Sequence, residues 1–135
     1  MPDSSTSDPA SGIITKTGTG TVAAAVSKLI ELVVARGMIV FAIVDHSGEA
    51  KRHGLVLRDT KVVIFGSPTV GTPVMQASPL TALDLPLKVL IWDDAGQTTV
   101  SYYSPAALAA RHQLPADLAA KIAATDPLTD ALVAP

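Results

Sequence analysis

The chain contains no cysteine, which excludes disulfide bonds, thiolate nucleophiles, iron–sulfur clusters and cysteine-ligated zinc. Basic residues are also few. Lys51 and Arg52 are the only adjacent basic pair, and the formal net charge of the 135 residues is −2. A protein that binds nucleic acid normally carries a basic patch or stripe, and aromatic residues for base stacking are scarce here at 4%. We therefore expect no nucleic acid partner.

The sequence also lacks a secretory signal and a membrane span. Residues 1–11 are rich in Ser, Asp and Pro and have no apolar stretch, which predicts a disordered N-terminal tail. The longest apolar stretch, residues 22–44, is interrupted by Lys28, Glu31 and Arg36, each costly near a bilayer centre. These features predict one domain over residues 12–135 in a reducing, cytoplasmic location, with no membrane partner.

Apolar spacing in residues 22–33 predicts a helix that begins after Thr21 as its N-cap and ends before Gly37. The next strand, residues 38–44, is apolar at every position, so we expect either burial on both faces or contact with a partner subunit. Further strands are predicted over residues 61–65, 87–92 and 98–103, with a tight turn at residues 93–96.

This order of elements is strand, helix, four strands and then helices near the C-terminus. The hairpin predicts antiparallel pairing. The fold class is therefore α+β, a mostly antiparallel sheet with helices on one face.

Residues 18–23 match the dinucleotide-binding pattern G-x-G-x-x-A, which brings a backbone close to a pyrophosphate at a helix N-terminus. Lys16 and Thr17 make the preceding strand weak, and Asp45 lies farther away than the usual spacing of about 20 residues. Dinucleotide-binding folds continue with further βαβ units, whereas this chain continues with a hairpin. These observations favour a turn with a helix cap over a nucleotide site, and we expect no cofactor.

Asp45 and His46 follow the apolar strand at residues 38–44 and are candidates for acid–base chemistry. The alternative is structural, in which Asp45 or Ser47 caps a short helix and His46 bonds to the loop. Asp84 is a third candidate carboxylate, although an Asp before Leu-Pro more often fixes a turn. No second histidine lies close enough in sequence to predict a metal site.

The Gly- and Pro-rich loop over residues 66–75 is the candidate ligand-binding segment. Gly66 and Gly71 give the backbone freedom, and Ser67 and Thr72 offer hydroxyls that bind an anion together with backbone N–H groups. No lysine follows in the pattern of a P-loop, which excludes an NTPase of that class. The structural alternative is a rigid crossover that packs against the sheet.

Four groups of residues, in this order along the chain, resemble the domain-of-unknown-function 302 family. They are Val44-Asp45-His46, the run from Val63 to Met75 with its Phe-Gly-Ser-Pro and Gly-Thr-Pro-Val-Met motifs, the Leu-Asp-Leu-Pro-Leu-Lys-Val-Leu-Ile-Trp run at residues 83–92, and Ser101-Tyr102-Tyr103. The resemblance covers residues 12–115. It implies a TATA-binding-protein-like arrangement, strand–helix–four strands–helix, and implies neither DNA binding nor a general activity. Relatives commonly carry Asn where this chain has Ser67.

Three functions remain open from the sequence. The first is a small-molecule binding module, homodimeric, that takes an anionic ligand in a pocket made by Asp45, His46, Asp84 and the loop over residues 66–75. The second is an enzyme in which His46 is the general acid–base and Asp45 or Asp84 orients it. The third is a structural or interaction domain without a pocket.

Overall fold

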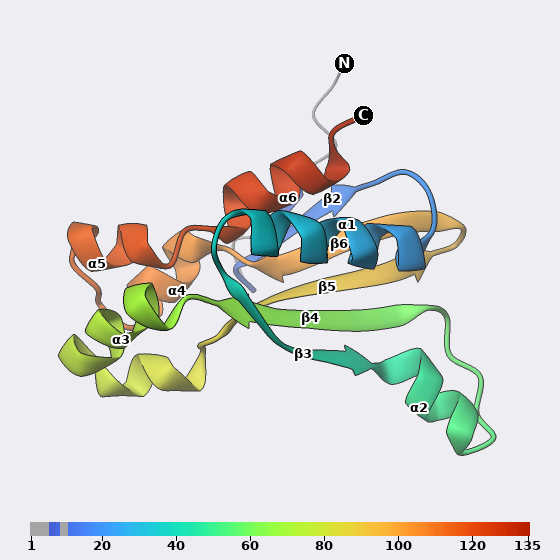
Figure 1. The fold of residues 1–135 in the computed structure, drawn as a ribbon, viewed down its shortest axis with the longest axis horizontal. Helices are drawn as coiled ribbons and strands as arrows, with labels where there is room; N and C mark the ends of the chain where they lie inside the picture. The colour runs from blue at the N-terminus through green and yellow to red at the C-terminus, as the bar shows by residue number, and fades with distance from the viewer. Residues whose placement is uncertain (1–5, 9–10) are drawn as a thin grey trace.

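The computed structural model describes residues 6–8 and 11–135 (Figure 1). The strands are β1 (Thr6–Asp8), β2 (Ile13–Thr17), β3 (Ile39–Asp45), β4 (Thr60–Gly66), β5 (Leu87–Asp94) and β6 (Gln97–Tyr103). The helices are α1 (Val22–Ala35), α2 (His46–Arg52), α3 (Pro68–Ala77), the 3₁₀ helix η1 (Pro79–Leu83), α4 (Pro105–Arg111), α5 (Ala116–Lys121) and α6 (Thr125–Val133).

The strands of the described residues form one antiparallel sheet in the order β1-β2-β6-β5-β4-β3. The first long strand, β2, thus pairs with the last, β6, while β3 forms an edge. The α+β class with an antiparallel sheet and packed helices, predicted from the sequence, is confirmed. Where the sequence predicts a disordered tail, the described part, β1, pairs with β2; the rest of residues 1–10 lies outside the described residues.

Helices α1 and α6 cover one face of the sheet (Figure 1). The buried face of α1 carries Val22, Val26, Leu29 and Val33, at the helical spacing that the sequence shows. These side chains join a core with strand residues such as Phe65 and Ile91 and with Leu128 and Leu132 of α6. Thr21 caps α1 by accepting a hydrogen bond from the N–H of Ala24 at 3.0 Å, as predicted.

The glycine motif before α1 forms a turn that is tied to the β5–β6 hairpin. The side chains of Gln97 and Thr98 donate hydrogen bonds to the carbonyl oxygens of Gly18 and Gly20, at 2.5 and 2.6 Å. Gly20 has φ +76°, a conformation that favours glycine. Gly20 thus has a conformational reason to be glycine, and the motif forms a turn that leads into the cap at Thr21.

Two segments differ from their predicted structure. The strand β3, for which the sequence predicts either burial on both faces or contact with a partner subunit, is not buried within the chain. It lies at the sheet edge with most of its side chains exposed, because long-range pairing rather than local hydrophobicity sets strand order. Most of the loop expected over residues 66–75 is helical: Pro68 begins α3 at its first position, and the Ser67 carbonyl accepts from the N–H of Gly71 at 2.8 Å.

A buried lysine attaches α6 to the sheet. The Nζ of Lys16, in β2, is 2.7 Å from both Thr129 Oγ1 and Asp130 Oδ1 and lies over the ring of Tyr102. Burial lowers the pKa of Lys16, but Asp130 and Tyr102 outweigh burial and leave that pKa raised. The Tyr102 hydroxyl donates to Asp126 Oδ1 at 2.5 Å, so β2, β6 and α6 share one polar cluster.

We predict that Tyr102→Phe lowers the free energy of unfolding by about 1–2 kcal/mol, because the ring stays while the hydroxyl loses its hydrogen bond to Asp126 and its interactions with Lys16 and Thr129. Urea denaturation followed by circular dichroism measures this change. Tyr103→Phe is the matched control, since that side chain is half exposed, and should shift the value by less than about 0.5 kcal/mol. Equal effects of the two substitutions would contradict the role of the cluster.

Candidate functional site

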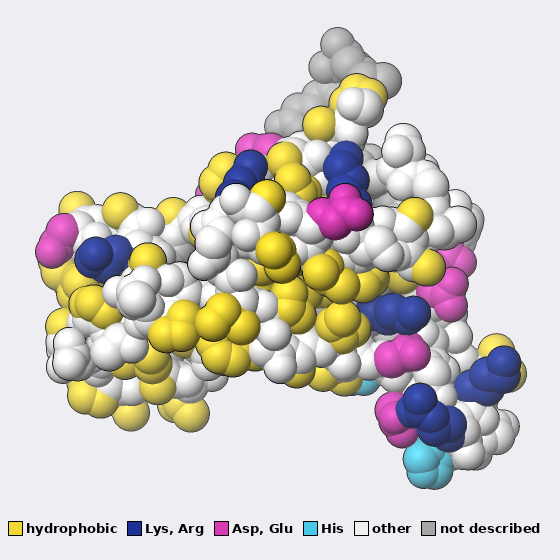
Figure 2. All heavy atoms as spheres, in the orientation of Figure 1, with side chains coloured by type: hydrophobic (Ala, Val, Ile, Leu, Met, Phe, Trp, Pro, Cys, Tyr) yellow, Lys and Arg dark blue, Asp and Glu magenta, His cyan; other side chains and the backbone are white. Residues whose placement is uncertain are grey.

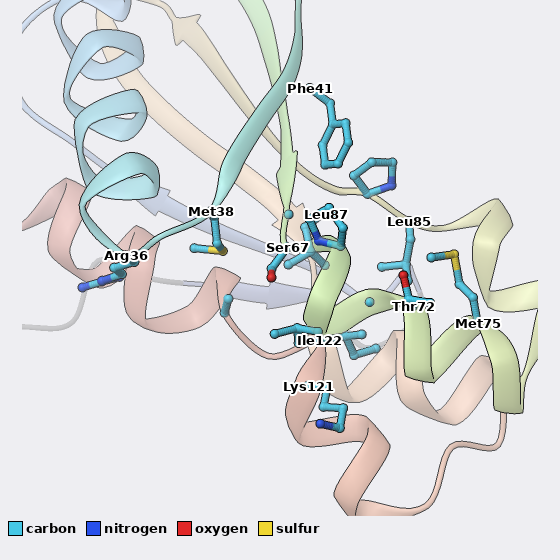
Figure 3. A pocket seen from close by; sticks show the side chains of 16 residues that line it. Arg36, Met38, Phe41, Ser67, Thr72, Met75, Leu85, Leu87, Lys121 and Ile122 are labelled. Atoms are coloured by element: carbon cyan, nitrogen blue, oxygen red, sulfur yellow. The ribbon is translucent and has the colours of Figure 1, made fainter.

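A pocket of about 580 Å³ lies at the end of the sheet where β4 leads into α3 (Figure 3). Its walls come from the α1–β3 connection, the start of β3, the segment from Gly66 to Met75, the start of β5 and the end of α5. The lining residues are Arg36, Met38, Phe41, Gly66, Ser67, Pro68, Val70, Gly71, Thr72, Met75, Leu85, Pro86, Leu87, Lys121, Ile122 and Ala124.

Most of the lining is apolar. Figure 3 shows Met75 and Leu85 close together at one side of the pocket, with the Thr72 hydroxyl beside them and the Ser67 hydroxyl nearer the centre. Ser67 Oγ lies 2.9 Å from Thr69 Oγ1, which gives it a polar partner outside the lining. The pocket therefore combines an apolar wall with a few hydroxyl groups, the usual composition of a small-molecule site.

Two cations belong to the lining, and no carboxylate does, among the described residues. Arg36 follows α1 as its C-cap, and Lys121 is the last residue of α5. Both side chains are exposed, so they sit at the rim rather than in the wall. The only two charges in the described lining are therefore positive, and Figure 3 shows both side chains directed outward from the pocket.

Glycine at position 71 keeps the α3 wall of the pocket open. A Cβ there would lie 3.9 Å from both Leu85 Cδ1 and Met75 Cε, which is ordinary contact. Alanine would therefore fit, but a larger side chain would extend among these neighbours. Gly66 is similarly close to Phe41 and Pro86.

The predicted ligand-binding residues Gly66, Ser67, Gly71 and Thr72 all line this pocket. Sequence reasoning missed its other polar or charged lining residues, Arg36 and Lys121, which are separated from the 66–75 segment by 30 and 46 residues or more. No local pattern connects them, since each reads as an ordinary basic residue at a helix end.

Asp45 and His46 do not share the pocket, contrary to the expectation. Ile39 pairs with Gly66, whereas Asp45 pairs with Lys61 at the other end of β3. Phe41 is the last residue of β3 that lines the pocket, and at about 3.3 Å per residue the strand separates it from Asp45 by roughly 13 Å. His46 begins α2 and is not a lining residue.

Asp45 caps α2, which is the structural alternative considered for it. Its Oδ1 accepts hydrogen bonds from Gly48 N at 2.9 Å and Ser47 Oγ at 3.1 Å. The bond from Gly48, with smaller contributions from Ser47, Lys61 and Arg52, lowers the pKa of Asp45 despite some desolvation. A Cβ at position 48 would overlap the Asp45 carboxylate, so the carboxylate would have to shift if a side chain stood there.

Asp84 pairs with residues of α4 and its C-cap, not with His46. Its Oδ2 lies 2.6 Å from His112 Nε2 and 3.2 Å from Arg111 Nη1. Desolvation raises the pKa of Asp84, but hydrogen bonds to His112 and Arg111 outweigh it and leave the pKa lowered. The triad attaches the η1–β5 connection to α4, a role consistent with the turn-fixing alternative.

Within residues 6–8 and 11–135, no group of three His, Asp or Glu side chains is placed to hold a metal ion. None of the helices described there is long and apolar enough to cross a membrane.

Comparison with known proteins identifies relatives of this chain. A family model described as "Domain of unknown function DUF302" matches residues 14–132. The crystal structure of an uncharacterised conserved DUF302 protein from Bacillus stearothermophilus has the same fold, with a TM-score of 0.76 and 16% identity over 90% of this chain and 95% of that one.

Two curated relatives are named fluoride-specific ion channel FluC 1, from Brucella suis and Brucella abortus. Each is 39% identical to this chain over 105 residues, which is 77% of this chain. The chain spans only 41% and 39% of the length of these two relatives.

We predict that Asp84→Asn lowers the free energy of unfolding by about 1 kcal/mol at neutral pH, because the ion pair is partly exposed and only the hydrogen bonds to a charged acceptor weaken. The lowered pKa of Asp84 stabilises the fold above the ordinary Asp value of about 4, and this stabilisation is lost as the pH falls through the folded-state pKa. The difference from wild type should therefore shrink as the pH falls below the ordinary Asp value of about 4.

Urea denaturation at several pH values measures this difference. Asp94→Asn, at an exposed position at the end of β5, is the control and should show no such dependence. A difference that stays constant from neutral to acid pH would contradict the proposed pairing.

Proposed function

We propose that this chain, which belongs to the DUF302 family of domains of unknown function, binds a small amphipathic anion in the pocket beside α3. The observation that carries the proposal is the combination of a large apolar wall with two cations and no carboxylate among the described lining residues. A volume of about 580 Å³ falls in the range of sites that enclose small organic ligands.

The chemistry of the wall favours an apolar body for the ligand. Phe41, Met75 and Leu85 offer no hydrogen bond from their side chains, so a strongly polar body would lose its water without compensation. The hydroxyls of Ser67 and Thr72 leave room for one or two polar groups. A flexible hydrocarbon chain or a substituted ring fits these walls.

The rim favours a negative charge on the ligand. Arg36 and Lys121 form no ion pair with another described residue. Both are solvated, so each adds only about 0.5–1 kcal/mol to the binding of a carboxylate or sulfonate. The apolar wall would therefore supply most of the affinity, and the rim would select the sign of the charge.

Isothermal titration calorimetry tests whether the apolar wall supplies the affinity and the rim selects the charge. The three probes have equal chain length: decanoate, decan-1-ol and decylammonium. We expect decanoate to bind most tightly and decylammonium most weakly. The double variant Arg36→Gln/Lys121→Gln should weaken decanoate about 10-fold and leave decan-1-ol unchanged. Binding of all three probes with equal affinity would contradict the role of the rim, and binding of none would contradict the proposal.

A pocket-filling variant tests the location. Gly71→Leu should abolish decanoate binding, because the new side chain would extend into the space between Leu85 and Met75. Leucine has a higher helix propensity than glycine, so α3 should remain folded. Gly71→Ala is the matched control and should bind as wild type does, since its Cβ makes only ordinary contacts. Unchanged binding by Gly71→Leu, measured on a variant with wild-type circular dichroism, would place the ligand elsewhere.

We propose further that the protein is a cytoplasmic homodimer. The absence of cysteine agrees with a reducing compartment. The exposed, apolar edge strand β3 supports association. Catalysis by His46 is not part of the proposal, because Asp84 is paired with His112 and Asp45 caps α2.

The curated relatives favour a second candidate function, a companion domain of an ion channel. Their similarity to this chain covers about two fifths of their length, and no described helix of this chain is long and apolar enough to cross a membrane. A variant of the Brucella suis relative from which the segment that matches this chain has been deleted tests this function. Fluoride efflux is measured from liposomes that contain this variant, with and without added chain. Added chain should change the efflux rate, and an unchanged rate would contradict the candidate.

A further inference from the structure

Eight of the large hydrophobic side chains that remain exposed lie on β3 or on segments near its two ends (Figure 1). We call this group the β3 edge patch: Ile39, Phe41, Ile43, residues 55–57, Leu80 and Leu83. Each of the eight is between 43% and 101% exposed. Figure 2 shows hydrophobic side chains along the edge where Figure 1 places β3. The surface curves inward there, between the part of the molecule that contains α3 and the part that contains α2.

Strand β3 has few of the features that keep an edge strand from pairing. Its residues from Ile39 to Val44 include no charge and no proline, and its first charged residue is Asp45. A register shift between Val40 and Ala42 is the one irregularity. The opposite edge differs, since β1 has only three residues. An apolar seven-residue edge is therefore open to a second strand.

The size of the patch matches what a stable dimer needs. The exposed surface of its eight residues is on the order of 1,000 Å², against about 800 Å² contributed by each partner in a standard interface. Scattered exposed hydrophobes are normal on a protein of this size, but several on one unpaired edge strand, with others on the segments at its two ends, point to an interaction site.

We propose that a second copy of this chain covers the β3 edge patch, with the two β3 strands antiparallel about a twofold axis near Ala42. Ala42 is the middle residue of the strand, so this axis gives the longest overlap. A twofold axis makes the patch meet itself, as an isologous interface requires. The inference rests on the proposed homodimer and adds the surface and the symmetry.

This arrangement places part of the partner beside the ligand pocket. Antiparallel overlap puts the partner's strand end, with α2, next to the end of β3 that pairs with Gly66. The exposed apolar residues 55–57 closely follow α2 in the chain. Leu80 and Leu83 belong to η1, which packs on α3, a wall of the pocket in the copy that residues 55–57 would meet. Phe41 belongs both to the patch and to the pocket lining. Dimerisation would therefore shield one pocket wall from water.

Sedimentation velocity between about 1 and 100 µM tests the surface, a range in which interfaces of standard size associate. Wild type should sediment as a dimer. Ile43→Lys and Val56→Lys should each raise the dimer dissociation constant about 100-fold or more, because each places two unpaired charges in the interface. Val56 is fully exposed, so that variant should retain the wild-type melting temperature. Val34→Lys, at an exposed position of α1, is the control and should remain dimeric.

A disulfide reporter tests the axis, since the chain has no cysteine of its own. Ala42→Cys should form a covalent dimer under mild oxidation at concentrations where Ala106→Cys, at an exposed position of α4, stays monomeric on a denaturing gel.

The outcomes separate this inference from the proposals on which it rests. A dimer that persists in both lysine variants would overturn the β3 interface while leaving the homodimer intact. A wild-type monomer at every concentration would overturn both. Decanoate binding can be measured in either case, so the pocket proposal is tested independently.

Discussion

The backbone pairing of β2 with β6 is the constraint on which the architecture depends. It places the first long strand beside the last, at the opposite side of the sheet from β3. Helix α1 must therefore cross the sheet, and it contacts β6, β5, β4 and β3 in doing so. This crossing buries one face of the sheet and brings Arg36, at the end of α1, to the side of the sheet where β3 lies. Strand β3 itself remains an edge strand.

Local sequence patterns predicted the parts of the fold that depend on local physics. The apolar spacing of α1 and the capping hydroxyl of Thr21 act within a few residues, so both could be predicted and are found. The β5–β6 hairpin follows from its tight turn in the same way. The composition of the 66–75 segment likewise indicated four pocket-lining residues, although most of the segment is helical rather than a loop.

Features that depend on distant partners could not be predicted. An apolar run such as β3 reads as buried, and only the pairing order of the whole sheet shows that it lies at an edge. Asp84 and His112 are 28 residues apart, and nothing around either residue indicates the other. The same holds for Arg36 and Lys121, which the packing of α1 and α5 brings to one rim. Because Asp45 and His46 are adjacent, the sequence suggested acid–base chemistry by the pair. In the structure Asp45 caps α2, and neither residue lines the pocket.

The cap of α2 links two positions in a way that bears on sequence evolution. Asp45 needs the N–H of Gly48, and a side chain at position 48 would occupy the space of the carboxylate. Substitutions at the two positions are therefore coupled. A descendant of this sequence can gain a side chain at position 48 only after the residue at position 45 shortens or turns away. Covariation of these two positions among homologues would thus record a steric constraint at the start of α2, with no need for a shared catalytic role.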